Sequence, residues 1–265
     1  MKIEMRAFPM FDDERQIFNG LTAAFRSVDS RTSNACRKIE AAQEHYFKIN
    51  PSHEEAYKLK ARDLLRNSLM KFTYCSMVTE QIHSLKNIIE LNLNEGKQFD
   101  ASEELFLTSV LFDNALFLWR SFLDFYLKYL VYFVCIKEIE SMHVSAFKKQ
   151  FQNIRTEKAE KVASYIFKNV ISEKSDQKSN LWGDTLRSFR DKTSHNTLIT
   201  PTMSENEGLC GIKRLTPKIN EMTVADFVQR TFENPAFEML VALQPTLYEV
   251  DWRSGPYFKG IYESY

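Results

Sequence analysis

The longest regular pattern in the chain is an apolar stripe whose members lie three and four residues apart. This spacing puts them on one face of an α-helix and carries that face for about nine turns. The segment Asn94-Glu95-Gly96 ends it. The stripe consists of Leu64, Leu65, Leu69, Phe72, Cys75, Val78, Ile82, Leu85 and Ile89.

The composition favours more helices of this kind. Seven glycines and seven prolines among 265 residues leave few helix breakers, whereas Leu, Glu, Lys, Phe and Ala are plentiful. Long helices are therefore favoured over many short strands. We predict an all-α protein, a helical bundle in which residues 1–265 form a single domain, because no polar linker demands a boundary.

Charge and cysteine usage limit the classes of function. Thirty-five basic and thirty-five acidic residues leave no net charge, so any contact with nucleic acid needs a local patch. Cys36, Cys75, Cys135 and Cys210 lie far apart without C-x-x-C spacing, which predicts buried free thiols. The segment that follows Met1 lacks the apolar run of a signal peptide, and we expect a cytoplasmic protein.

Two long helices are predicted at the start of the bundle. The first covers about residues 12–50, with a possible kink or break at Asp29 to Asn34, and Pro51 stops it. The second begins after acidic residues near Glu54, where the helix dipole favours them. The short connection predicts an antiparallel helical hairpin, and the length of both helices also fits a coiled-coil scaffold.

A third and very apolar helix is expected from Leu105 to Ile139, after a capping-box spacing from Asp100 to Glu103. We interpret it as a central, buried helix. It is not expected to cross a membrane, because charges interrupt it and the run from Tyr129 to Ile136 is too short.

The charges in this segment share one helical face. They can form a solvated face of mutually paired groups, or they can border a functional cleft. The residues are Asp113, Arg120, Asp124 and Lys128.

The remaining elements are shorter. We expect a polar loop from Ser172 to Asn180, and either a small hairpin or a mobile loop from Thr202 to Pro217. The aromatic tail from Val250 to Tyr265 is expected to pack on the body. Helices are predicted at Val144 to Asn153, at Thr156 to Ile171, and from near Thr223, with a bend at Pro235, to about Pro245 or a few residues beyond.

Only one segment carries a pattern typical of catalysis. Leu186 to His195 reads as the end of a helix with Arg190 and His195 near its last turn. Gly-rich phosphate loops, G-x-S-x-G and H-E-x-x-H are missing from the sequence, so no metal site or cofactor is expected. The predicted buried face of this helix consists of Trp182, Leu186, Phe189 and Thr193, and the scattered histidines are His45, His53, His83 and His143.

In this context Leu186 to His195 resembles the R-x4-6-H motif of the HEPN family (higher eukaryotes and prokaryotes nucleotide-binding), in which a polar residue such as Asp191 often follows the arginine. The resemblance covers about residues 54–250 and leaves the helix at about 12–50 as an addition. It implies an all-α bundle and, in many members, a metal-independent endoribonuclease. In that reaction a ribose 2′-hydroxyl attacks the adjacent phosphodiester, leaving a cyclic phosphate and a 5′-hydroxyl.

The residue types suit this chemistry. His195 can exchange a proton near neutral pH, and Arg190 can stabilise the charge that develops on the phosphate. Asp191 lies one turn before His195, so its carboxylate can orient the imidazole. The predicted substrate-binding residues are Arg187, Lys192 and Ser194.

Helical geometry raises a further requirement. Arg190 and His195 diverge by about 140° on an ideal helix, so they meet at one phosphate only if the helix loosens near Ser194 or a second chain contributes. We therefore expect a homodimer, and the resemblance implies that it acts on RNA. The resemblance implies a toxin or phage-defence effector, with an antitoxin or nucleotidyltransferase as a possible partner. The alternative is a non-catalytic binding or scaffold module, in which Arg190 and His195 only complement the helix dipole.

Overall fold

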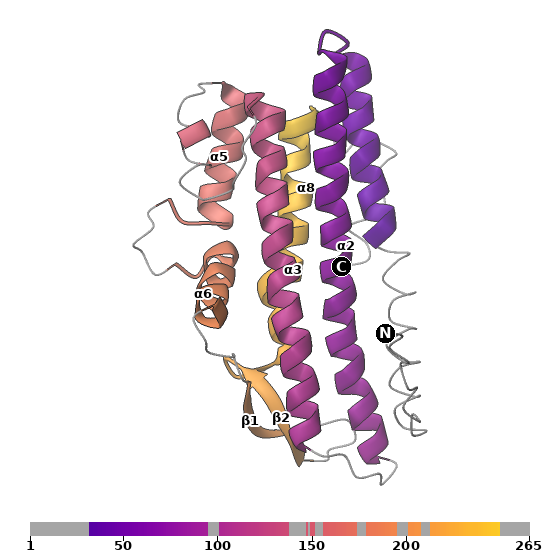
Figure 1. Ribbon diagram of the computed structural model, residues 1–265, viewed down its shortest axis with the longest axis vertical. Helices are drawn as coiled ribbons and strands as arrows, with labels where there is room; N and C mark the ends of the chain where they lie inside the picture. Colours follow the sequence, from indigo (N-terminus) through magenta and orange to yellow (C-terminus); the bar gives the residue numbers. More distant parts are fainter. Residues whose placement is uncertain are drawn as a thin grey trace, which may run out of the picture.

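The computed structural model describes residues 32–94, 101–137, 147, 149–151, 156–173, 179–194, 201–207 and 213–249. In this part of the chain long helices run side by side, and a small sheet lies at one end of the bundle (Figure 1). The predicted all-α class is confirmed, with the small sheet as an addition to it.

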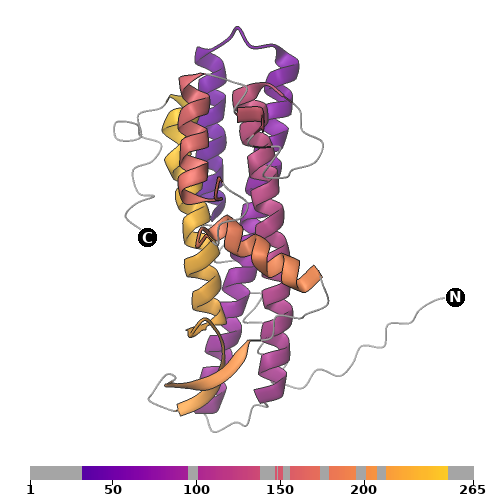
Figure 2. The ribbon, with the colours of Figure 1, turned by 90° about the vertical axis from the view of Figure 1, so that its left-hand side faces the viewer.

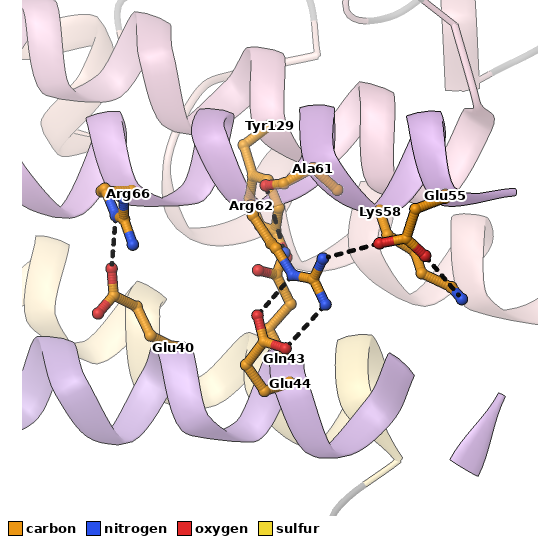
Figure 3. A network of polar contacts seen from close by, with 9 residues as sticks. All are labelled: Glu40, Gln43, Glu44, Glu55, Lys58, Ala61, Arg62, Arg66 and Tyr129. Carbon is orange, nitrogen blue, oxygen red and sulfur yellow. Dashed lines mark hydrogen bonds and ion pairs between the residues drawn. The ribbon is translucent and has the colours of Figure 1, made fainter. Parts of the chain in front are cut away.

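The first two helices form the predicted antiparallel hairpin. Residues 32–49 are helical, Asn50 and Pro51 lie in the turn, and α2 (Glu55–Asn94) follows. Arg62 lies 2.6 Å from Glu44, whereas Arg66, one turn further along α2, lies 3.7 Å from Glu40 (Figure 3). The two helices therefore run in opposite directions. The predicted helix at residues 12–31 lies outside the described residues.

The third helix, α3 (Ala101–Cys135), lies against the full length of α2 and is central to the core. Its fully buried aromatic side chains are Phe112, Trp119, Phe122, Tyr126 and Tyr129. The predicted end at Ile139 is wrong, because Ile136 takes a left-handed conformation (φ 54°) that stops the helix. Among the described residues, no helix is long and apolar enough to span a membrane.

A buried polar network joins four helices of the bundle. The Gln43 side-chain amide donates to the Ala61 carbonyl and to the Tyr129 hydroxyl, each at 3.3 Å (Figure 3). The Tyr129 hydroxyl also forms a 2.5 Å hydrogen bond with the hydroxyl of Tyr248. Each of these side chains is buried, so the network fixes how the first helix, α2, α3 and the last helix pack together.

The C-terminal half contains shorter elements. Residues 147 and 149–151 are helical, in agreement with the short helix predicted there. Thr156 caps the predicted helix α5 (Glu157–Asn169), accepting a 3.2 Å hydrogen bond from the Ala159 amide. After α6 (Trp182–Ser194), the chain forms the hairpin that the sequence left undecided: β1 (Thr202–Glu207) pairs antiparallel with β2 (Lys213–Ile219), and β2 pairs with β3 (Met222–Thr223).

The last helical segment changes its winding near the predicted bend. Thr223 caps α7 (Val224–Val228), and a π-helical turn, η2 (Gln229–Glu233), connects it to α8 (Asn234–Tyr248). Pro235 lies in the first turn of α8, where its missing N–H is tolerated. Lys158 of α5 caps the far end by donating 3.1 Å to the Leu247 carbonyl.

Replacing Tyr129 with Phe tests the buried network. The hydroxyl of Tyr248 and the amide of Gln43 would remain buried without this partner, so we expect Tyr129→Phe to lower the free energy of unfolding by about 1–3 kcal/mol. Tyr74→Phe is the matched control, because Tyr74 is 46% exposed and should change stability by less than about 0.5 kcal/mol. If chemical denaturation gave the same free energy of unfolding for both variants, the buried network would not have this stabilising role.

Candidate functional site

The helix that carries the predicted motif lies on the outside of the bundle. Figure 1 places α6 at the edge of the molecule, and Figure 2 shows it crossing α3 obliquely on the face toward the viewer. Within the described part of the chain, no other helix lies over the outer side of α6 (Figure 2). Ser188, on the side of α6 opposite Leu186, is exposed.

The inner face of α6 packs as predicted. Trp182 and Leu186 are buried in the core. The ring of Phe189 is half-buried, with its centroid 6.0 Å from Phe112 of α3 and 5.6 Å from Phe227 of α7. These aromatic contacts hold the C-terminal half of α6 near the middle of α3. The side chain of Thr193, the fourth member of the predicted face, lies outside the described residues.

Gly183 allows the first turn of α6 to pack closely on its neighbours. Its amide donates 2.9 Å to the carbonyl of Val170, at the end of α5. A Cβ atom at this position would lie 2.7 Å from that carbonyl oxygen and 2.8 Å from a methyl group of Ile171. Since both distances are shorter than van der Waals contact, only glycine fits without a shift of the backbone.

Asp184 ties α6 to the chain segment that precedes it. Its Oδ2 accepts 2.7 Å hydrogen bonds from the amide of Ser172 and from the hydroxyl of Ser179. The Ser179 hydroxyl in turn accepts from the amide of Leu181 at 3.1 Å. We refer to these contacts as the Asp184 clamp. The sequence prediction missed it, although an aspartate in the first turn of a helix is a signal for such backbone contacts.

Arg187 is the only residue of the predicted site whose side chain lies within the described part of the chain. Its guanidinium is 3.9 Å from Asp184, and 29% of its side chain is exposed. The Nη2 atom is buried and has no hydrogen-bond partner among the described residues. Because Nη2 is buried, only the exposed part of the guanidinium is open to an anionic ligand.

The other predicted residues are described in part or not at all. Arg190, Asp191, Lys192 and Ser194 belong to the helical backbone of α6, but their side chains lie outside the described residues. The whole of His195 also lies outside them. The predicted meeting of Arg190 and His195 therefore stays a prediction.

The charged face of α3 is paired, as one reading of the sequence predicted. Arg120 Nη2 lies 3.0 Å from Asp124, and the Lys128 ammonium lies 5.9 Å from the centroid of the Phe125 ring. Asp113 differs, because its Oδ1 is buried and has no hydrogen-bond partner among the described residues. Burial raises the pKa of this carboxyl group.

The cysteines and His53, which lie outside α6, have surroundings that suit a structural role. Cys36, Cys75 and Cys135 are free and buried, as predicted, whereas Cys210 lies outside the described residues. Burial raises the pKa of Cys36 to about 11, so the thiol form dominates at neutral pH. His53 lies among aromatic rings, 5.0 Å from the centroid of Tyr57. Among the described residues, no three His, Cys, Asp or Glu side chains are placed to share a metal ion.

Comparisons with known proteins add no assignment to this geometry. No protein-family model, curated protein or solved structure matches the chain. The functional interpretation of α6 therefore rests on its residues and on its position in the bundle.

Replacing Gly183 with Ala tests the close packing that positions α6. The added methyl group would overlap the Val170 carbonyl, and we expect a loss of about 1–3 kcal/mol in the free energy of unfolding. Ser188→Ala, at an exposed position of the same helix, is the control and should not destabilise the protein. A Gly183→Ala variant as stable as the native chain would show that the backbone adjusts at no cost.

Proposed function

We propose that this protein is a metal-independent endoribonuclease of HEPN type, with its active site at the C-terminal end of α6. The observation that carries the proposal is the position of this helix. Gly183, Asp184 and the aromatic contacts of Phe189 hold α6 across the outside of the bundle, with its outer side accessible. A helix held in this way presents its last turn to a ligand in a defined orientation.

The proposed reaction needs one proton-transfer group and one fixed positive charge. The ribose 2′-oxygen forms a bond to phosphorus, and the bond from phosphorus to the 5′-oxygen breaks. His195 exchanges the proton that moves in this step, and Asp191 orients its imidazole. Arg190 stabilises the negative charge that builds up on the phosphate oxygens. The products are a cyclic phosphate and a 5′-hydroxyl.

RNA binding at this helix relies on a local excess of positive charge. α6 contains three basic residues, Arg187, Arg190 and Lys192, against two acidic ones, Asp184 and Asp191. The carboxylate of Asp184 already accepts the hydrogen bonds of the Asp184 clamp. The side chain of Arg187 is 29% exposed, and a phosphate oxygen is an acceptor that suits the exposed part of its guanidinium. We assign substrate contacts to Arg187, Lys192 and Ser194.

The proposal extends to the biological setting. We assign the protein to the cytoplasm, and we propose a homodimer in which Arg190 of one copy and His195 of the other reach the same phosphate. On an ideal helix the two residues diverge by about 140°, and a second chain is one of the two ways, beside a loosening near Ser194, to bring them together. The setting is that of a toxin or phage-defence effector whose activity an antitoxin or a nucleotidyltransferase partner restrains.

A second candidate function is a non-catalytic binding module. Phe106 and Phe117 on α3 are 66% and 69% exposed, and exposed aromatic side chains are typical of surfaces that bind other proteins. In that case Arg190 and His195 would only complement the dipole at the end of α6.

An RNA cleavage assay separates the two candidates. Purified protein incubated with RNA and a chelator should produce fragments that end in a cyclic phosphate. His195→Ala should lower the cleavage rate at least about a hundredfold, because the proton-transfer group is lost. His45→Ala, at an exposed position of the first helix, should cleave like the native chain.

Two outcomes would contradict the proposal in different ways. Cleavage that persists in His195→Ala would exclude the assigned site. Native protein that binds but never cleaves RNA, or that does neither, would favour the binding module. Thermal unfolding of each variant shows whether a lost activity reflects a lost fold.

A further inference from the structure

Polar side chains lie along the core-facing side of α2 in its C-terminal half. Ser76, Thr79 and Glu90 are 3%, 1% and 6% exposed, which is uncommon for polar residues. Together with the two polar residues between Thr79 and Glu90 they are spaced three and four apart, so they share one face of the helix. We call this set the α2 polar face: Ser76, Thr79, His83, Lys86 and Glu90.

The imidazole of His83 is half-buried and incompletely hydrogen-bonded. Its Nε2 atom is buried and has no hydrogen-bond partner among the described residues. A neutral ring can leave this nitrogen as an unpaired acceptor, whereas a protonated ring would need an acceptor for the N–H at that position. Burial lowers the pKa of His83 for the same reason.

The first turn of α7 lies beside His83. A small cavity separates this turn from the turn of α2 that contains His83, and it offers about 10 Å³ to the centre of a water molecule, which is room for one water. Full hydration of a charged Nε2 requires more room, which α7 can provide by moving away from α2. The helical residues that line the cavity on these two sides are Ile82 and Lys86 of α2, and Val224 and Ala225 of α7.

The charged groups around His83 do not supply the missing acceptor. Glu80 of α2 and Asp226 of α7 favour the protonated ring and Lys86 opposes it, but burial is the largest effect. The Oδ2 atom of Asp226 already accepts a 2.6 Å hydrogen bond from the hydroxyl of Thr223, the residue that caps α7. A protonated His83 can therefore gain this carboxylate as a direct partner only if the first turn of α7 rearranges.

A movement of α7 would reach the motif helix. Phe227 of α7 is buried, and its ring centroid lies 6.1 Å from Phe112 of α3 and 5.6 Å from Phe189 of α6. Phe189 is held by these two rings, so separation of α7 from α2 removes one of the two aromatic contacts that position the C-terminal half of α6.

We propose that His83 is a pH-sensitive switch, whose protonation in mildly acidic solution releases α7 from α2 and thereby loosens α6. The release itself requires no nuclease activity. A loss of RNA cleavage that accompanies the release would rest on the proposed function.

The direction of the pH dependence follows from the buried imidazole. In the closed state the pKa of His83 lies below its ordinary value of about 6.5, which the ring regains when α7 moves away. The open state therefore binds more protons between these two values. The closed state is fully stable above about pH 6.5 and loses stability as the pH falls toward the lowered pKa, with the opening equilibrium rising by up to about tenfold per pH unit.

A histidine titration of the full native chain by NMR tests the buried state of the ring. The chain has five histidines, and the signal of His83 is the one that is missing from His83→Gln. It should titrate at a lower pH than the signal of His45, which is exposed on the first helix and is assigned in the same way from His45→Gln. A His83 signal that titrates together with that of His45, or at higher pH, would overturn the switch.

Hydrogen exchange of the full chain at pH 7.5 and pH 5.5 tests the release. After correction for the intrinsic exchange rates, protection of Val224 to Val228 and of α6 should fall at least about threefold at the lower pH, whereas α5 should keep its protection. The fall should disappear in His83→Gln and persist in His45→Gln. His83→Asn takes the place of His83→Gln if the latter does not fold.

The outcomes are independent of the cleavage assay, because neither measurement involves RNA. A loss of protection that affects α5 equally, or that persists without His83, would overturn the switch whether or not RNA is cleaved. A chain that opens at α7 through His83 but never cleaves RNA would support the switch and contradict the proposed function.

Discussion

The rotation of α3 about its own axis is the constraint on which the rest of the structure depends. Trp119, Phe122 and Tyr129 are fully buried on one side of this helix. Removing aromatic side chains from water stabilises the fold by roughly 2–3 kcal/mol each, so no other rotation of α3 can compete. The hydrogen bonds of Tyr129 with Gln43 and Tyr248 fix the same orientation. The opposite side of α3 must then face outward, including Phe106 and Phe117.

The position of the candidate site follows from this core through a few contacts. Leu186 packs into the bundle, Phe189 packs on Phe112, and Gly183 allows α6 to approach the end of α5. The Asp184 clamp adds hydrogen bonds that only a correctly placed first turn of α6 can accept. A helix attached by one side in this way combines a rigid base with an accessible outer face. The proposed action on RNA would make use of this combination.

Periodicity was enough to predict most helices and the inner face of α6, because burial of one face produces a regular pattern in the sequence. Other features depend on contacts between distant residues. The strands of the hairpin, with segments such as Thr202 to Glu207, are too polar to alternate visibly. The end of α3 depends on the backbone of Ile136, and the clamp joins Asp184 to Ser172 across a turn. The exposure of Phe117 also could not be predicted from the sequence, because an apolar residue in an apolar helix looks like part of the core.

The central claim is that two chains share each active site, with Arg190 and His195 of different copies at one phosphate. Mixing the Arg190→Ala and His195→Ala variants tests it most directly. Each variant alone should be inactive. After exchange of subunits, half of the dimers would be mixed and would have one complete site of two, so the mixture should regain about a quarter of the native cleavage rate. A mixture as inactive as its components, with subunit exchange verified, would contradict the shared site.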